Sequence, residues 1–491
     1  MTNSILNIYH TGMRNIRNLA VFVLLGVFFG AGALYPQQRY PLGAIFDEAA
    51  YSRLPRKAPL ASRAYEGLPK SCSLKQYAPL PGDQTDYGTC VAWASAYAAR
   101  TISESVALDR KDQTDTTRNA FSPVYIYRSI RPDDPECRQG AQIFVALDLM
   151  KDSGAVKMID IERTTAFPRV DLSRYRESRK YPIADYVTLF SRDERSKPGL
   201  VVKTVKKSLV EGKPVIIGMN TPVSFMEADT VWQPAESPRS FYGGHAMCVV
   251  GYDDEKNGGA FEVINSWGRK WGSGGFIWIP YTAFAEFVME GYEIIENIAI
   301  YSDTVRFAGS AQVEIISGSG VRSAPLVPVS GAFYKTALPL EEGTRFRFTA
   351  ESGESAYVYA FAASQAPDTS AGPGEFFSPA LLFPQAGVSP LLNYRDSVIT
   401  MPGDDKSLVL DNVPGMEYLF ILYAKQALDI RAIMRRFESA RGTPAERLSA
   451  AVGPALLKAG AVSYGGENAA FTAETGDSRA VAALVVAIDH R

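Results

Sequence analysis

The residues in this chain that could do chemistry are few, because histidine is nearly absent. Of its three histidines, His10 precedes an N-terminal apolar run and His490 is the second-last residue, so His245 is the imidazole of the central region. Cys90 follows a turn-like Gly-Thr pair and opens an alanine-rich, helix-like stretch. A thiol at a helix N-terminus beside an imidazolium has a lowered pKa and becomes a nucleophilic thiolate. Cys90 and His245 are therefore the candidate nucleophile and general base.

Two side-chain amides could complete such a site. Asn265 lies near the end of a neighbouring apolar strand, where its amide oxygen could accept the ring N–H of His245 and select the tautomer. Gln84, six residues before Cys90, could help the Cys90 backbone N–H to hold a developing oxyanion. Trp267 could shield the Asn–His hydrogen bond from water. Taken singly, each residue has a simpler structural interpretation, such as a buried cysteine or histidine, a turn asparagine or a solvated glutamine.

The elements that must position these side chains follow from periodicity and from helix-start signals. We expect helices over 90–108, 140–151 and 201–211, and another that begins at Pro123 after a Ser122 N-cap. We expect strands over the apolar runs 214–218, 246–252, 260–265 and 275–280. Helices first and strands afterwards indicate an α+β fold with two packed lobes.

Past about residue 303 the pattern changes to a period of two, which is typical of half-buried strands. We expect an additional β-sandwich-like domain there, carrying helices near 426–438 and 444–459 and ending in a strand at 480–488. A chain of 491 residues exceeds one ordinary core, so several domains are expected. The sequence divides into a signal peptide or anchor (1–33), a linker or short pro-segment (34–68), a catalytic region (69–303) and a β-rich accessory region (304–491).

Composition argues against several functions. The formal net charge is −2 and no basic stripe is present, so no nucleic-acid partner is expected. Four cysteines without a CxxC pair, and three histidines, predict neither a metal site nor a cofactor. Arg14 and Arg17 precede an apolar run at 19–33 that is short for a membrane span and ends in a small-x-small sequence. We expect a secreted or periplasmic protein, with membrane contact only through an uncleaved N-terminal segment.

Together the motifs resemble the papain-like cysteine peptidase family, bacterial type, over about residues 69–300. The resembling sequences are Gln84-x-x-x-Gly88-Thr89-Cys90, Gly244-His245-Ala246, Asn265-Ser-Trp-Gly268 and Phe121-Ser-Pro-Val-Tyr-Ile-Tyr127. The resemblance implies a helical lobe and a β-barrel-like lobe, with a protein or peptide substrate across the cleft between them. It implies that Cys90 is the nucleophile, His245 the base and then the acid, Asn265 its orienting partner and Gln84 an oxyanion donor.

The chain departs from the family pattern near the nucleophile. Val91 stands where the family usually has Trp, and Tyr87 where a disulfide cysteine often precedes the nucleophile. Cys137 resembles the other half of that bridge, so either Cys72 replaces the missing partner or both thiols are free. Cys248 is expected to be a core strand residue. The usual long inhibitory pro-region is absent, which argues against the family's ordinary zymogen control.

The C-terminal region resembles an accessory domain of uncharacterised function that is found in bacterial exported and signalling proteins. The resembling sequences are Ala356-Tyr-Val-Tyr-Ala-Phe361, Leu382-Phe-Pro384, Ile399-Thr-Met-Pro402 and Gly415-Met-Glu-Tyr418. That resemblance implies a protein or cell-surface partner, and a plain spacer is the alternative.

We therefore expect an exported cysteine endopeptidase that hydrolyses peptide bonds through a Cys-His-Asn acyl-enzyme mechanism. One alternative is a binding protein that keeps a papain-like fold without turnover. Another is a transpeptidase or ligase that passes the same acyl-enzyme to an amine, since sequence does not separate hydrolysis from aminolysis.

Overall fold

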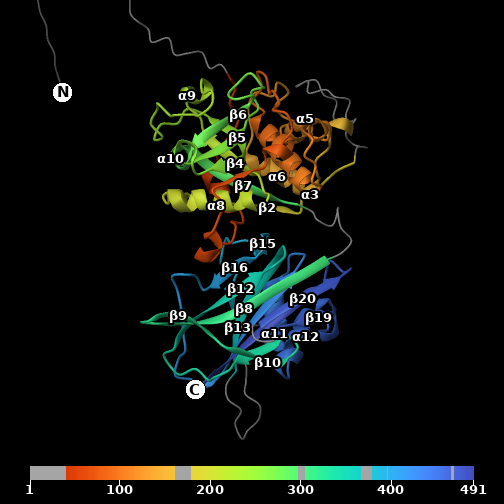
Figure 1. The fold of residues 1–491 in the computed structure, drawn as a ribbon. Coiled ribbons are helices and arrows are strands. Elements are labelled where there is room, and N and C mark those ends of the chain that lie inside the picture. Colours follow the sequence, from red (N-terminus) through yellow and green to blue (C-terminus); the bar gives the residue numbers. More distant parts are fainter. Residues whose placement is uncertain (1–39, 161–178, 297–304, 366–378, 395, 466–468) are drawn as a thin grey trace, which may run out of the picture. The chain divides into compact units, whose positions relative to one another are not determined.

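The computed structural model describes residues 40–160, 179–296, 305–365, 379–394, 396–465 and 469–491 (Figure 1). The expected signal or anchor at 1–33 and the expected boundary at 303/304 therefore lie outside the described residues. No helix in the described part of the chain is long and apolar enough to cross a membrane.

The helix expected over 90–108 exists, but it is not uniform. It runs through α2 (Cys90–Ala92), a π-helical stretch η3 (Trp93–Arg100) and α3 (Thr101–Ala107). Every residue of η3 is buried, and four of its eight residues are alanine, so neighbouring elements pack close to its backbone. π-Helical turns inside helices are frequent at functional sites. Here the continuous helix places Cys90 at its first position.

The other expected helices are confirmed with small shifts in their ends. Ser122 is the N-cap of α5 (Pro123–Ile130), since its hydroxyl accepts the Tyr125 backbone N–H. The remaining longer helices of this region are α6 (Ile143–Asp152) and α8 (Pro198–Val210). Short helices are α1 (Glu48–Tyr51), α4 (Gln113–Arg118), α7 (Arg192–Arg195), α9 (Val223–Met226) and α10 (Tyr281–Phe287).

An antiparallel sheet follows these helices and carries the histidine strand. Its order is β2 (Asp185–Thr188), β7 (Val288–Ile295), β3 (Val215–Asn220), β4 (Gly244–Asp253), β5 (Ala260–Ile264) and β6 (Phe276–Pro280), with β1 (Ser71–Ser73) paired to β4. The four expected strands correspond to β3, β4, β5 and β6, whereas β1, β2 and β7 were not anticipated. β4 is buried over nearly its whole length because strands flank it on both sides. Cys248 lies on β4 and is completely buried, as expected.

Two further sheets make up the C-terminal region. One has the order β10 (Leu326–Ser330), β11 (Phe333–Thr336), β21 (Val481–His490), β18 (Gly415–Ala424), β13 (Ala356–Gln365) and β14 (Ala380–Phe383), with β15 (Leu391–Leu392) paired to β13. The other has the order β16 (Ser397–Met401), β12 (Arg345–Ser352), β8 (Val305–Ser317), β20 (Ala469–Thr475) and β19 (Val462–Tyr464), with β17 (Leu408–Val409) on β12 and β9 (Gly320–Ala324) on β8.

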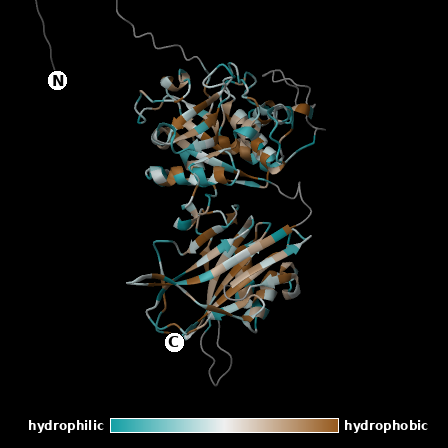
Figure 2. Cartoon of the chain, in the orientation of Figure 1, coloured by the Kyte–Doolittle hydropathy of each residue, from teal (hydrophilic) through white to brown (hydrophobic). Residues whose placement is uncertain are grey.

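Apolar side chains from both of these sheets share one hydrophobic core, as in a β-sandwich. Phe346 and Val313 of one sheet belong to the same buried cluster as Leu419 and Leu484 of the other. The opposite face of the β13–β18–β21 sheet is covered by α11 (Ile430–Ser439) and α12 (Pro444–Val452), where Phe437 packs on aromatic side chains of the sheet. Figure 2 shows hydrophobic residues concentrated along these strands. Both expected helices and the final strand are thus confirmed.

The structure decides one alternative that the sequence left open. The four cysteines are free thiols, so Cys72 and Cys137 form no disulfide. The Cys72 thiol instead donates to the Leu209 carbonyl oxygen at 3.4 Å. Cys137 is buried, and the Gly88 N–H donates to its carbonyl oxygen at 2.8 Å. A backbone hydrogen bond thus joins this loop to the turn before the nucleophile.

Candidate active site

Cys90 lies at the N-terminus of its helix and beside the histidine strand. It is completely buried, and the Ala246 N–H points to its sulfur with an N···Sγ distance of 3.4 Å. Because Ala246 follows His245 on β4, this contact places the thiol next to the imidazole-bearing backbone. The helix N-terminus contributes partial positive charge, which favours a thiolate over a thiol.

His245 and Asn265 are hydrogen-bonded to each other at the ends of adjacent strands. The distance from Nε2 of His245 to Oδ1 of Asn265 is 2.7 Å. An amide oxygen only accepts, so Nε2 carries the proton and Nδ1 of a neutral ring is an acceptor. Within the described residues Nδ1 has no hydrogen-bond partner, which leaves it available to the thiol. The ring of Trp267 stacks on the imidazole at 4.4 Å and covers it, as the sequence predicted.

Gln84 is held in place by the segment that carries Asn265. The Ser266 hydroxyl donates to Oε1 of Gln84 at 2.6 Å, and the Gln84 backbone N–H donates to the Ser266 carbonyl at 2.8 Å. These bonds fix which end of the amide faces the site. Nε2 then donates to the carbonyl oxygens of Tyr87 at 2.7 Å and of Pro41 at 3.3 Å. Sequence reasoning missed Ser266, because a serine next to an asparagine carries no distinctive signal.

Residues 40–46, which we call the occluding segment, lie over this site in an extended conformation. The ring of Tyr40 stacks on Trp267 at 4.7 Å. The N–H groups of Gly43 and Ala44 donate to the Gly244 carbonyl oxygen at 3.0 and 2.9 Å. The segment therefore pairs with the backbone of the residue that precedes His245.

The other side of the occluding segment pairs with the loop before α6. The Ala141 N–H donates to the Gly43 carbonyl at 2.9 Å, and the Ile45 N–H donates to the Ala141 carbonyl at 2.9 Å. Glycines allow this close approach. A Cβ on Gly244 would lie 1.9 Å from the Ala44 carbonyl oxygen, and one on Gly140 would lie 2.4 Å from the Gly43 carbonyl oxygen.

Two apolar side chains of the occluding segment, Leu42 and Phe46, pack on glycines on the sheet side of the site. The ring of Phe46 lies over Gly218 of β3, so closely that a Cβ there would be 2.7 Å from the ring. Leu42 covers Gly243 in the same way. The sequence predicted a linker or short pro-segment over 34–68, and it gave no indication that part of it lies in the candidate site.

The buried environment disfavours charge on both members of the candidate pair. Burial raises the pKa of the Cys90 thiol to about 11, although backbone hydrogen bonds from Ala246 and Gly43 oppose the shift. Burial also lowers the pKa of His245 to about 4, and the Asn265 hydrogen bond opposes that shift. In this occluded arrangement the neutral thiol and the neutral imidazole are the stable forms at neutral pH.

The structure thus links the four candidate residues: Gln84 is bonded to Ser266, beside Asn265; Asn265 is bonded to His245; and the N–H of the next residue, Ala246, contacts the Cys90 sulfur. Val91, where the family pattern has Trp, is completely buried and belongs to the same hydrophobic core as Cys90. No group of three His, Cys, Asp or Glu side chains within the described ranges is arranged to hold a metal ion.

Comparison with known proteins supplies independent information on the family. Residues 82–292 match the model of the papain family of cysteine proteases. An uncharacterized peptidase C1-like protein of Acanthamoeba polyphaga mimivirus is 29% identical over 219 residues, which cover 42% of this chain and 65% of the viral protein.

Solved structures that resemble part of the chain include a cysteine protease and a procathepsin. Xylellain, a cysteine protease from Xylella fastidiosa, has 20% sequence identity and a TM-score of 0.41, covering 52% of this chain and 96% of its own. Procathepsin B from Trypanosoma congolense has 16% sequence identity and a TM-score of 0.41, and the match covers 52% of this chain and 87% of the procathepsin chain. The family match includes Gln84, Cys90, His245 and Asn265, and it ends before the C-terminal sheets. Residues 82–292 of this chain are a papain family cysteine protease domain.

Proposed function

We propose that the chain is a cysteine endopeptidase whose site is closed by its own residues 40–46. The observation that carries the proposal is the 2.7 Å bond between His245 and Asn265, beside a cysteine at a helix N-terminus. The bond holds the imidazole in the tautomer whose free nitrogen can take a thiol proton.

The reaction requires an open site. Nδ1 of His245 takes the proton of the Cys90 thiol, and the sulfur attacks the carbonyl carbon of a peptide bond. The Cys90 N–H and Nε2 of Gln84 donate to the oxyanion that forms. His245 then gives its proton to the leaving amine as the C–N bond breaks, which leaves a thioester on Cys90. Water, deprotonated by His245, attacks the thioester and releases a carboxylic acid and the thiol.

The occluding segment supports latency in two ways. It uses the Gly244 carbonyl and both backbone groups of Ala141, which are groups that an extended peptide substrate could otherwise pair with. By covering the site it also adds to the burial that disfavours charge on Cys90 and His245; burial is the larger cause at Cys90, where the segment's own Gly43 hydrogen bond acts in the opposite direction. Opening the site would hydrate both groups, and a thiolate–imidazolium pair would then cost less free energy.

The proposal includes export from the cytoplasm, for which the support is sequence alone. Arg14 and Arg17 precede the apolar run at 19–33, and a small-x-small sequence ends that run. The N-terminal residue of the protein recovered from each cell fraction tests this. Recovery of uncut chain solely from the cytoplasm would remove export from the proposal.

The catalytic proposal is tested by covalent labelling with an epoxysuccinyl peptide, which alkylates activated thiolates. For this test, a protease cleavage site is inserted between Ser52 and Arg53. Cutting there frees the occluding segment before labelling. We expect Cys90 to be labelled stoichiometrically in the cut protein, slowly in the uncut protein and poorly in a cut His245→Ala variant. Peptide mapping distinguishes Cys90 from the half-buried Cys72. Equal labelling of the cut protein and its His245→Ala variant would favour the binding-protein alternative.

A further inference from the structure

Residues 55–63, which we call the strap, run between the edge of the peptidase sheet and the C-terminal region. On one side the Thr188 N–H at the end of β2 donates to the Pro55 carbonyl at 3.0 Å, and the Lys57 N–H donates to the Thr188 carbonyl at 2.8 Å. On the other side the Arg56 N–H donates to the Gly387 carbonyl at 2.9 Å, and the Ser389 N–H donates to the Arg56 carbonyl at 2.7 Å. The strap is thus hydrogen-bonded along both edges.

A buried polar network fixes the middle of the strap. Nζ of Lys57 contacts Oε1 of Glu293 on β7 at 2.7 Å and Oδ1 of Asn393 at 2.8 Å. Asn393 and Tyr394 also donate to the Glu293 carboxylate, at 2.6 and 2.8 Å. Burial opposes ionisation of Glu293, but the Lys57 and Lys213 charges and hydrogen bonds outweigh it and lower its pKa. Burial also lowers the pKa of Lys57 to about 7, with the Glu293 charge opposing that shift, so the charges of this pair depend on the contacts that the strap makes here.

The remainder of the strap contacts the C-terminal region. Ala58 and Leu60 are buried in the hydrophobic core that the two C-terminal sheets share. The Ala61 N–H donates to the Val398 carbonyl at 2.8 Å. The backbone N–H and the hydroxyl of Ser62 both donate to Asp404, at 2.6 and 2.8 Å.

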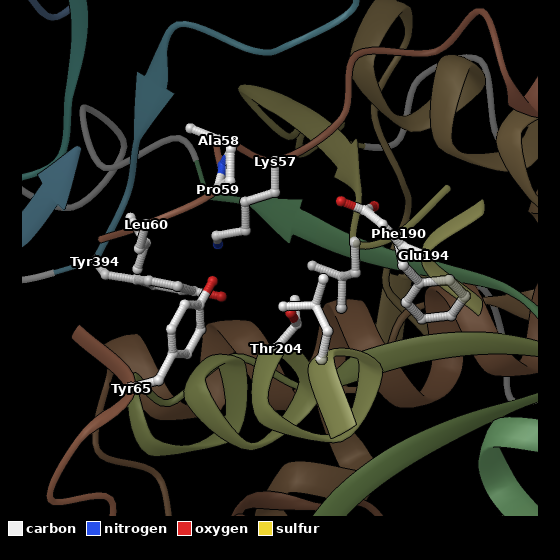
Figure 3. Close-up of a pocket in the computed structure, with 11 residues that line it drawn as sticks. Lys57, Ala58, Pro59, Leu60, Tyr65, Phe190, Glu194, Thr204 and Tyr394 are labelled. Carbon is white, nitrogen blue, oxygen red and sulfur yellow. The ribbon is translucent and has the colours of Figure 1, made fainter. Parts of the chain in front are cut away.

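Figure 3 shows how the strap lies against both parts of the protein. Lys57 and Leu60 extend from the strap toward a pocket that Thr204 of α8 and Tyr394 also line. The Lys57 ammonium lies 3.3 Å from the centre of the Tyr394 ring. A cation over an aromatic face in a desolvated place adds to the attraction of the ion pair.

We propose that the C-terminal region is an intramolecular clamp whose binding partner is the strap, and that the clamp keeps the occluding segment in the active site. The residues that connect Phe46 to Pro55 are few, so a held strap keeps residues 40–46 at an effective concentration on the order of millimolar. Ser52 and Arg53 lie between the two segments and are exposed. A cut there would separate the occluding segment from the clamp, whereas a cut beyond the strap would not.

Two matched cleavage sites test the clamp in the full chain. One is inserted between Ser52 and Arg53, and the other between Glu66 and Gly67, which are also exposed. Both cleavage sites are introduced into a Cys90→Ala variant, so that the measured retention of the fragment does not depend on peptidase activity. After cutting, size-exclusion chromatography with intact-mass detection measures how much N-terminal fragment stays with the remainder on dilution.

We expect the fragment that ends at residue 66 to remain bound on the order of 10²- to 10⁴-fold more tightly than the fragment that ends at residue 52. Replacing Leu60 with Asp, or Asp404 with Ala, should release the longer fragment, while Pro59→Ala at an exposed strap position should not. Equal retention of the two fragments, whether both stay or both leave, would overturn the clamp.

The inference rests on the proposed latency, but the two fail differently. If the clamp is correct and the peptidase proposal wrong, the fragments differ in retention while Cys90 in the wild-type background stays unlabelled after either cut. If only the clamp is wrong, the two fragments are retained equally, and Cys90 is labelled to the same extent after each cut: freely if both fragments leave, slowly if both stay.

Discussion

The backbone of Gly43 lies directly against that of Gly88, two residues before the nucleophile. A Cβ on Gly43 would come within 2.1 Å of the Gly88 carbonyl oxygen, and neither backbone has a flexible side chain that could yield. The occluding segment therefore depends on having no side chain at this position. Replacing Gly43 with Val should displace the segment, together with its backbone hydrogen bond to the Cys90 thiol, while every candidate catalytic residue keeps its identity.

The Gly43→Val change should open the site of the uncut chain. Overpacking of this kind costs roughly 1–3 kcal/mol, so labelling of Cys90 by an epoxysuccinyl peptide should be on the order of 10- to 100-fold faster. Ile45→Ala is the matched control, because the Ile45 side chain in the same segment is 40% exposed. An unchanged labelling rate in Gly43→Val would show that the segment does not limit access to the thiol.

The His245–Asn265 bond predicts a specific kinetic defect. In the transition state the imidazole is charged, and a hydrogen bond to a charged group contributes about 1.5–3 kcal/mol. Asn265→Ala should therefore lower kcat/KM of the opened enzyme on the order of 10- to 150-fold. Circular dichroism of the variant checks that it folds. A variant that cleaves peptide at the wild-type rate would remove Asn265 from the mechanism.

Ser266 and Gln84 should act as one unit, because the serine hydroxyl bonds the glutamine amide at 2.6 Å. Loss of an oxyanion donor lowers kcat on the order of 10²- to 10³-fold, which is the expectation for Gln84→Ala. Ser266→Ala should cause a smaller loss, since it leaves Nε2 present but less well oriented. In the double variant Ser266→Ala should have no further effect. Additive losses would mean that Ser266 contributes by another route.

The sequence predicted the placement of the candidate site better than its surroundings. His245 and Asn265 were expected to meet because both lie at or near the ends of neighbouring strands, and the register of β4 with β5 brings their side chains together. Cys90 was expected at a helix start because a turn precedes a run without glycine or proline, and it is there. The catalytic roles of these residues stay predictions.

What the sequence did not predict depends on contacts between distant residues. Lys57 and Asn393 are 336 positions apart, and no local pattern marks either as a partner of the other. β7 was missed because Glu290 and Glu293 interrupt its apolar run, and buried carboxyl groups look like loop residues when their partners are unknown. The strap was missed because its residues have no periodicity of their own. Its partners lie far away along the chain, so no local pattern marks it as a structural element.

Thiol reactivity should report the state of the site through its pH dependence. With the segment in place, burial raises the pKa of Cys90 to about 11, so the neutral thiol predominates below that pH. Iodoacetamide should alkylate Cys90 in the uncut chain only as the pH rises toward 11. After cleavage between Ser52 and Arg53 and removal of the fragment, the profile should extend to neutral pH. Identical profiles for Cys90 before and after cleavage would contradict this.

Glu290 predicts that the protease domain loses stability as the pH rises. Burial raises the pKa of its carboxyl group to about 7, with the Tyr292 and Asp47 hydrogen bonds opposing the shift. An acid whose pKa is higher in the folded state favours folding fully below its unfolded value of 4.5, and that contribution disappears as the pH passes about 7. The difference corresponds to roughly 3 kcal/mol. Glu290→Gln, which keeps the shape without the charge, should remove this part of the pH dependence.

Melting temperatures of the Cys90→Ala protein at pH 5 and pH 8 measure the effect of Glu290 without self-cleavage. Ionisation of Glu290 should make the parent protein melt at a higher temperature at pH 5 than at pH 8. Glu290→Gln should narrow this gap between the two melting temperatures. Glu255→Gln is the matched control, because the exposed Glu255 pairs with Lys70, whose side chain is 80% exposed, and such pairs contribute little. If both variants change the gap equally, burial of Glu290 is not its cause. A gap that widens in Glu290→Gln would mean that the carboxylate is charged in the folded protein, held by the Tyr292 hydroxyl at 2.9 Å.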